Sequence, residues 1–370
     1  MTPAATEKSS GKSAAPFSPF PAQTHWKLAF DKSLGVPPAY DGERGYFSIE
    51  GDQLAAYDLN SGMPRWLVSA RPASWPVVAG GLLFLDQTDA LVALRTTDGT
   101  AAWQTPLASK LTVPLSAGNG RLLGISGTSV FAYGAEDGSL AWRRDVPAPA
   151  NAAPTIVGDR VYVPTADRIV ALRAGDGAPV WERRLGGATH GILAANQRLF
   201  VGSSDNFLYC LNARDGQIEW RWRTGADVVS LPMADETRVY FVSLDNVIRA
   251  LNQRNGVQQW KRALPFRPAW GPVKAADTLL LTGIDGPPRA FTLKEGTPAG
   301  ELVTEPGAEI AASLHVFDSP GRFGPTIVAV TRQLASGATV IAASRSIDPP
   351  VLTTLMPLPG YVPMTPAAVR

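Results

Sequence analysis

The chain has 370 residues, of which 45% are hydrophobic, 18% charged and 8% aromatic, with 35 glycines and 32 prolines. This composition is globular and rich in turn-forming residues, which disfavours a helical protein. The formal net charge of +2 gives no global field that would attract nucleic acid or an acidic membrane. The single cysteine, Cys210, excludes an intramolecular disulfide and a cysteine-based metal site.

Residues 1–23 are rich in Ala, Ser and Pro and lack the apolar core of a signal peptide, so we expect a flexible tether. No stretch of the chain reaches the roughly 18 consecutive apolar residues of a transmembrane helix. We expect a single β-propeller domain over residues 24–358 and a C-terminal tail over residues 359–370.

Tryptophan recurs at nearly constant spacing between residues 26 and 260, with successive intervals of 40, 37, 39, 39, 39 and 40 residues. Six of these tryptophans end the same eleven-residue phrase: AYDLNSGMPRW (56–66), ALRTTDGTAAW (93–103), AYGAEDGSLAW (132–142), ALRAGDGAPVW (171–181), CLNARDGQIEW (210–220) and ALNQRNGVQQW (250–260). A fixed period of this length indicates a repeat architecture.

Each phrase predicts a hairpin, because its Asp-Gly, Asn-Gly or Ser-Gly pair supplies the positive φ of a tight turn between two strands. Two further strands precede each hairpin. Four antiparallel strands in about 40 residues are typical of a propeller blade. Helical repeats would need Gly-free stretches of 3.6-residue periodicity, which are absent, and a β-sandwich would need no fixed period.

We therefore predict an all-β, eight-bladed β-propeller of four-stranded antiparallel blades. A seventh blade over residues 271–303 would have an apolar residue near Leu302 in the tryptophan position, and an eighth would use strands at 326–330, 338–344 and 351–356. Trp26 precedes the first full repeat, so we expect its strand to pair with the last blade and close the ring. Seven blades with an appendage is the alternative.

The phrase A-[LY]-x-x-x-[DN]-G-x-x-x-W resembles the repeat of the pyrroloquinoline quinone (PQQ) enzymes and of their non-enzymatic relatives, such as the outer-membrane assembly lipoprotein BamB. The resemblance covers residues 24–303 well and the rest weakly. It implies that the repeat tryptophans dock against the neighbouring blade, which agrees with the large area that an indole buries. These residues are Trp66, Trp103, Trp142, Trp181, Trp220 and Trp260.

The resemblance does not carry enzyme activity to this chain. PQQ dehydrogenases are longer and carry a vicinal cysteine pair and acidic and asparagine ligands for calcium, whereas this sequence has one cysteine. The three histidines (His25, His190 and His315) lack metal-binding spacing, and neither a nucleophile elbow nor a P-loop occurs. We predict no catalytic, cofactor-binding or metal-binding residue, although binding of free PQQ stays open. Cys210 occupies the Ala position of the repeat, which indicates an inert packed thiol.

Basic residues follow four successive repeat tryptophans. They are Arg143, Arg144, Arg183, Arg184, Arg221, Arg223, Lys261 and Arg262. Their position on outermost strands indicates protection of the sheet edges, with nucleic-acid or anionic-surface binding as the alternative.

Propellers bind ligands and partners on their faces, so the loops that lead into the innermost strands are our candidate interaction face. The candidates are Trp75, Asn151, His190, Asp227, Arg267 and Trp270. Trp75 and Trp270 fall outside the repeat position, so blade packing does not require them, and exposed Trp and Arg are typical interface anchors. The other interpretation is that both tryptophans only pack the loops.

The function that we predict is a non-enzymatic, monomeric scaffold that binds a protein partner. It would lie in the cell envelope (periplasmic or extracellular) if an upstream signal has been removed, and in the cytoplasm otherwise. The alternatives are a ligand-binding or sensor propeller for PQQ or another small molecule, an enzyme with its site in the channel, and a binder of nucleic acid or an anionic surface through the basic flank.

Overall fold

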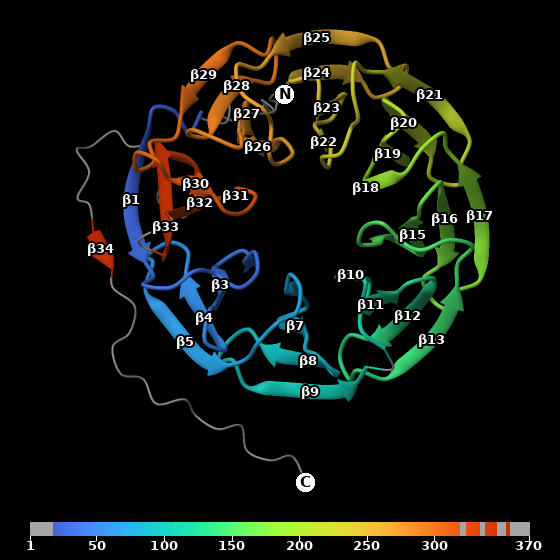
Figure 1. Cartoon of the computed structure of the whole chain (residues 1–370), viewed down its shortest axis with the longest axis horizontal. Coiled ribbons are helices and arrows are strands. Elements are labelled where there is room, and N and C mark those ends of the chain that lie inside the picture. The colour runs from blue at the N-terminus through green and yellow to red at the C-terminus, as the bar shows by residue number, and fades with distance from the viewer. Residues whose placement is uncertain (1–17, 108, 319–322, 334–336, 346–352, 356–370) are drawn as a thin grey trace, which may run out of the picture.

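The computed structural model describes residues 18–107, 109–318, 323–333, 337–345 and 353–355, and none of them is helical. Eight β-sheets stand around a central axis as the blades of a closed ring (Figure 1). The eight-bladed prediction is confirmed and the seven-bladed alternative is wrong. No helix in the described part of the chain has the length and apolar character to cross a membrane.

Seven blades are four-stranded antiparallel sheets whose strands follow chain order from the axis to the rim. Blades 1 to 3 consist of β2 (Ala39–Tyr40), β3 (Arg44–Ile49), β4 (Gln53–Asp58) and β5 (Pro64–Ser69); β6 (Val77–Ala79), β7 (Leu82–Asp86), β8 (Ala90–Arg95) and β9 (Ala101–Pro106); and β10 (Val113–Gly118), β11 (Arg121–Ser126), β12 (Ser129–Gly134) and β13 (Leu140–Asp145). Blades 4 and 5 consist of β14 (Thr155–Val157), β15 (Arg160–Pro164), β16 (Arg168–Arg173) and β17 (Pro179–Arg184); and β18 (Thr189–Ala195), β19 (Arg198–Ser203), β20 (Phe207–Asn212) and β21 (Ile218–Arg223). Blades 6 and 7 consist of β22 (Met233–Ala234), β23 (Arg238–Ser243), β24 (Val247–Asn252) and β25 (Gln258–Ala263); and β26 (Val273–Ala275), β27 (Thr278–Leu281), β28 (Arg289–Thr292) and β29 (Pro298–Glu301).

Blade 8 joins the two ends of the chain. Its strands are β30 (Glu309–Ile310), β31 (His315–Asp318), β32 (Phe323–Gln333), β33 (Gly337–Arg345), β1 (Ala22–Ala29) and β34 (Thr353–Leu355). The N-terminal strand β1 pairs antiparallel with β33, with Trp26 opposite Ala342, so the predicted closure is confirmed. β1 begins two residues before the domain boundary that we expected at residue 24. Residues 1–17 of the expected tether and the expected tail at 359–370 lie outside the described residues.

Each repeat tryptophan links its own blade to the next one. The indole Nε1 donates a hydrogen bond to a backbone carbonyl in the last hairpin of the following blade. The pairs are Trp66 to Thr96 (2.9 Å), Trp103 to Ala135 (3.0 Å), Trp142 to Ala174 (2.9 Å), Trp181 to Ala213 (3.2 Å), Trp220 to Gln253 (2.9 Å) and Trp260 to Leu293 (2.9 Å). Trp26 bonds Leu59 of blade 1 in the same way (3.0 Å). These hydrogen bonds join neighbouring blades at the positions where the resemblance implies that the tryptophans dock.

The turn glycine of the receiving hairpin has two roles. Gly138 has a φ of 69°, which the turn requires. It also lies under the ring of Trp103, where an added Cβ would come 2.5 Å from an indole carbon. The Asp-Gly pair of the repeat therefore supplies both the turn and a flat surface for the preceding blade's indole.

Blade 7 departs from this pattern. In the strand register Gly300, opposite Ala290, takes the tryptophan position, so our expectation of an apolar residue near Leu302 is wrong. Phe20, which is buried, lies directly over Gly300, where an added Cβ would come 2.8 Å from the phenyl ring. An aromatic ring from the N-terminal segment thus replaces the missing indole between blades 7 and 8.

The junction between blades 8 and 1 contains a partly buried histidine. The ring of His315 stacks on Tyr40 of β2, with centroids 4.2 Å apart and planes at 6°. Burial lowers the pKa of His315 to about 4, although the Asp41 carboxylate opposes this shift. Between about pH 4 and pH 6.5, the imidazole of His315 is therefore neutral in the folded protein and protonated in the unfolded chain.

We expect Trp142→Ala to lower the free energy of unfolding by about 3–5 kcal/mol, because the substitution removes a buried indole and its inter-blade hydrogen bond. Urea denaturation monitored by circular dichroism measures this change. Trp75→Ala, at a half-exposed indole outside the repeat, should cost less than about 1 kcal/mol. Equal losses of unfolding free energy in the two variants would contradict a special role of the repeat tryptophans in holding neighbouring blades together.

We expect stability to fall as the pH drops from about 6.5 towards 4, since the unfolded chain then binds a proton that folded His315 refuses. The loss is about 2–3 kcal/mol between pH 7.5 and pH 4.5. Comparing urea midpoints at the two pH values for the wild type and His315→Gln isolates this contribution. The pH dependence should be shallower in the variant, and identical slopes would count against the assignment.

Candidate functional site

The antiparallel blades divide the loops between two faces. Loops that enter each innermost strand lie on the same face as the loops between the second and third strands of a blade, and we call this the entry face. The repeat hairpins lie on the opposite face, which we call the turn face. The repeat hairpins on the turn face make the inter-blade contacts of the tryptophans. The loops of the entry face do not take part in these contacts, so their side chains are available for binding.

Two tryptophans from blades that are not neighbours meet on the entry face. Trp75 enters blade 2 and Trp270 enters blade 7, and blades 8 and 1 stand between them in the ring. Their ring centroids lie only 6.2 Å apart, with the planes at 53°. Since the two blades are not neighbours, both indoles must extend inward to meet. The sequence placed these two residues on a common face, and the structure brings them into contact.

A buried carboxylate fixes the Trp75 loop. Asp86, at the end of β7, accepts hydrogen bonds from the backbone N–H of Ser74 (2.9 Å) and from its hydroxyl (3.0 Å). The backbone N–H of Ala73 donates to the Asp86 carbonyl as well (2.8 Å). Burial raises the pKa of Asp86, and the bonds from Ser74 oppose that shift. The indole of Trp75 is therefore presented from a fixed loop although it is 46% exposed.

Backbone contacts fix the Trp270 loop. The N–H of Ile284 donates to the Arg267 carbonyl (2.9 Å), and the N–H of Ala269 donates to the Thr282 carbonyl (2.9 Å). On the other side, a Cβ on Gly271 would lie 2.4 Å from the Leu231 carbonyl oxygen, so only glycine permits this close approach. The loops of blades 6 and 7 form one supported surface.

Other apolar side chains are exposed in loops of the same face. The exposed ones on the entry face are Val229 (43%), Leu231 (51%), Ile284 (51%) and Val303 (72%). Sequence reasoning missed them, because the repeat explains the strands and leaves the loops unassigned. The available signal was an apolar residue in a loop beside Pro or Gly, as in Leu231-Pro232 and Gly283-Ile284.

The remaining candidates have separate environments. His190 lies in strand β18 and not in a loop; burial lowers the pKa of this imidazole, and the nearby Asp227 carboxylate acts in the opposite direction. Asn151 is a structural residue, since its amide donates to the carbonyls of Thr165 (3.2 Å) and Thr189 (3.4 Å). Arg267 is exposed on the Trp270 loop. The structure thus places Trp75, Trp270 and Arg267 on the entry face. The side chain of Asn151 is instead engaged in hydrogen bonds to the backbone.

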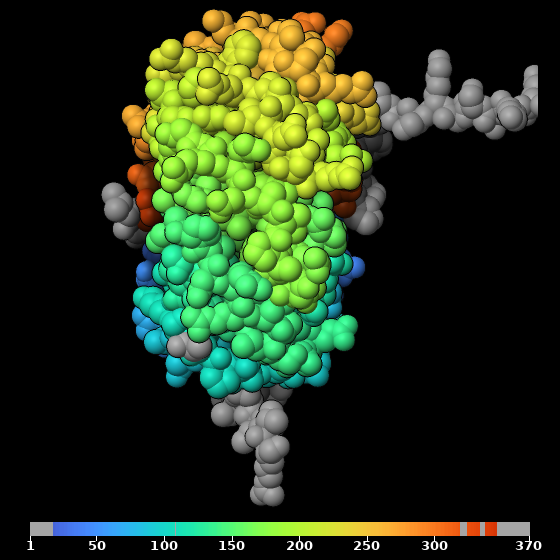
Figure 2. All heavy atoms as spheres, turned by 90° about the vertical axis from the view of Figure 1, so that its right-hand side faces the viewer, coloured from blue at the N-terminus to red at the C-terminus, as the bar shows by residue number. Residues whose placement is uncertain are grey.

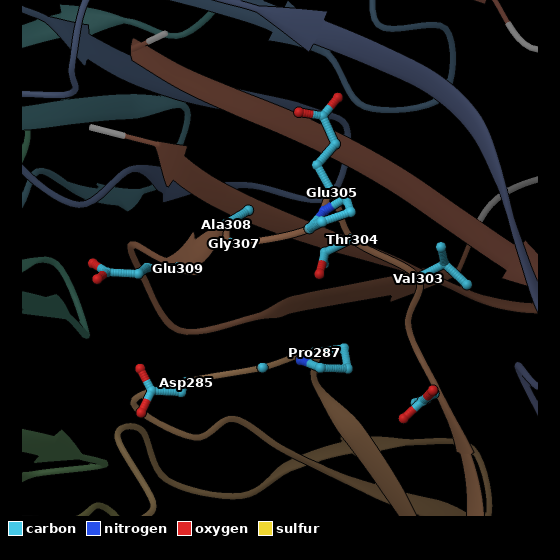
Figure 3. Close-up of a pocket in the computed structure, with 11 residues that line it drawn as sticks. Asp285, Pro287, Val303, Thr304, Glu305, Gly307, Ala308 and Glu309 are labelled. Carbon is cyan, nitrogen blue, oxygen red and sulfur yellow. The ribbon is translucent and has the colours of Figure 1, made fainter. Parts of the chain in front are cut away.

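A cavity of about 340 Å³ lies between the loops of blades 7 and 8 on this face (Figure 3). Four carboxylates line it, and three have basic partners: Glu305 pairs with Lys27, Glu309 with Arg332 (3.0 Å) and Glu301 with Arg289 (4.0 Å). Figure 3 shows the Asp285 and Glu309 carboxylates on one side of the cavity and Glu305 directed away from them. The cavity adds a recess to the entry face. Most of its carboxylates are ion-paired and so are not available together to bind a cation.

The basic flank on β13, β17, β21 and β25 has a role that we did not anticipate. Figure 2 views the ring edge-on from this side. The guanidinium Nε of Arg144, Arg183 and Arg262 donates to the turn-glycine carbonyl of the next blade, at 3.0, 2.7 and 3.1 Å. Each of these residues follows a repeat tryptophan by two positions, so each reinforces the same junction as the indole.

Groups suited to catalysis are sparse. Within the described ranges, no three His, Cys, Asp or Glu side chains are placed to hold a metal ion. Burial raises the pKa of the Cys210 thiol to about 12, which makes it a poor nucleophile. The residues present do not supply the vicinal thiols and calcium ligands that the resemblance assigns to PQQ dehydrogenases.

The sequence profile of the family described as "Outer membrane protein assembly factor BamB" matches residues 20–117, 88–185 and 167–346. BamB of Nitrosomonas eutropha is 26% identical over 214 residues (51% of this chain and 52% of the relative), and BamB of Moranella endobia is 22% identical over 200 residues (48% and 51%). The chain therefore spans about half the length of the curated relatives it matches.

Solved structures show the same fold at low identity. The crystal structure of BamB from Moraxella catarrhalis has a TM-score of 0.72 and 19% identity, covering 88% of this chain and 98% of that one. A quinohemoprotein alcohol dehydrogenase from Pseudomonas putida HK5 has a TM-score of 0.69 and 12% identity, covering 94% and 79%. Both similarities concern the propeller itself.

Proposed function

Because this chain belongs to the family described as outer membrane protein assembly factor BamB, we propose that it is a non-enzymatic propeller that binds a protein partner through its entry face. The partner would be a component of outer membrane protein assembly, as the names of the relatives suggest. The propeller would act as a monomer in the cell envelope, without a resident cofactor.

The observation that carries this proposal is the contact between Trp75 and Trp270. The blade junctions already have their own indoles, so ring closure does not need this pair. Fixed loops hold both rings, Trp75 is 46% exposed, Trp270 is partly buried, and Leu231 and Ile284 are exposed on the same face. Such a pair has the character of an interface hot spot. A loop that only needed packing would not leave Trp75 so exposed.

The similarity in fold to a quinohemoprotein alcohol dehydrogenase does not favour an enzyme or a PQQ sensor as the function of this chain. The likeness in fold comes with 12% identity, and function is determined by the site and not by the fold. Here the entry face offers indoles and aliphatic groups, and the carboxylates of its cavity are largely ion-paired. Such a surface fits a protein better than a quinone carboxylate or a calcium ion.

The proposal predicts that the double substitution Trp75→Ala and Trp270→Ala lowers partner binding at least tenfold, since hot-spot truncations cost about 2 kcal/mol or more. The measurement is quantitative co-purification of the outer-membrane assembly complex with the tagged full chain in its own bacterium.

Val257→Ala is the matched control, because it shortens a side chain that is 53% exposed on the turn face. This variant should retain binding. If the control weakened binding as much as the double variant, or if the double variant bound normally, the entry face would not be the interface.

A further inference from the structure

The rim of blade 8 differs from every other rim in the ring. Strand β34 pairs in parallel with the outer side of β1, placing Thr353, Thr354 and Leu355 opposite Trp26, Lys27 and Leu28. In the other seven blades the outermost strand ends the sheet, as far as the structure describes the chain (Figure 1). One sheet edge of the propeller therefore already accepts an added strand.

The edge of β1 is less protected by charge than four of the other outermost strands. Strands β13, β17, β21 and β25 each carry two basic residues after their tryptophan, a composition that discourages strand addition. Strands β5 and β9 carry none there and still end their sheets, so low charge permits strand addition but does not by itself cause it. β1 has a single lysine, Lys27, and that ammonium is ion-paired with Glu305. At eight residues β1 is also longer than those six-residue strands, so it offers more unpaired backbone.

The strand that covers this edge is weakly held. Its pairing extends over three residues and is parallel, the less stable arrangement per residue. β33 ends at Arg345 and β34 begins at Thr353, so β34 stays near β1 chiefly because the same chain connects them. A longer or better-matched strand can replace such a cover.

We propose that the outer edge of β1 is a strand-binding site, occupied within the chain by residues 353–355, and that an extended segment of a partner protein takes their place through main-chain hydrogen bonds. The partner segment would lie parallel to β1 and lack proline at the paired positions. This site is on the rim, away from the Trp75–Trp270 pair, so it stands or falls independently of the proposed function.

The test releases the internal strand in the full-length chain. Thr354→Pro removes a backbone donor and disfavours the paired conformation, whereas Thr354→Val keeps a β-branched residue and serves as the matched control. The probe is a synthetic peptide of residues 350–357. We expect it to bind the proline variant at least tenfold more tightly than the wild type or the valine variant.

Hydrogen–deuterium exchange of residues 26–28 gives a second readout. Among these amides, those that point towards β34 and not towards β33 should exchange faster in Thr354→Pro and regain protection when the peptide is added, whereas a peptide carrying Thr353→Pro and Thr354→Pro should not restore it. Thr353→Pro in the chain repeats the test at the neighbouring pair. Unchanged exchange in both proline variants, or faster exchange with no peptide binding, would overturn the proposal.

Discussion

A directional contact organises this propeller: the indole of one blade lies on the turn glycine of the next and donates to a carbonyl beside it. Blades 1 to 6 and blade 8 each give such an indole contact to the next blade, and Phe20 stands in for it at blade 7, so the interaction is heterologous and is satisfied everywhere only when the series closes on itself. Trp26 closes it towards blade 1, and Phe20 stands over Gly300 between blades 7 and 8. Two aromatic residues of the N-terminal segment thus complete the ring on both sides of blade 8.

This division of labour frees the entry face. Because the junctions are fixed from the turn face and the rim, the loops that enter the innermost strands can differ from blade to blade without weakening the ring. The loop that carries Trp75 and the 224–232 and 264–272 loops use that freedom to place apolar groups in water; Asp86 holds the backbone of the first, and the close approach of Gly271 to Leu231 supports the other two. Recognition and stability are therefore carried by different residues, which is why the two can be tested separately.

The sequence predicted the parts of the fold that repeat. The period of the tryptophans and the Asp-Gly turns identified the blades, and the position of Trp26 one period early predicted the closure. The sequence could not show Phe20 over Gly300, because that contact joins two segments about 280 residues apart and Phe20 lies outside the repeat. Likewise Trp75 and Trp270 could be assigned to one face, but their contact depends on the ring geometry of blades that are not neighbours.

The pairing of β1 with β33 places Ala22 opposite Arg345, so a strand that precedes blades 1 to 7 in the chain bonds to one that follows them. Blades 1 to 7 can form one after another from local hairpins, but the circle stays open until the C-terminal strands exist. During that interval β1 is a solitary strand with an unsatisfied edge. Blade 8 therefore cannot form until β33 has been synthesised, and a truncation that removed β33 would leave β1 without its antiparallel partner.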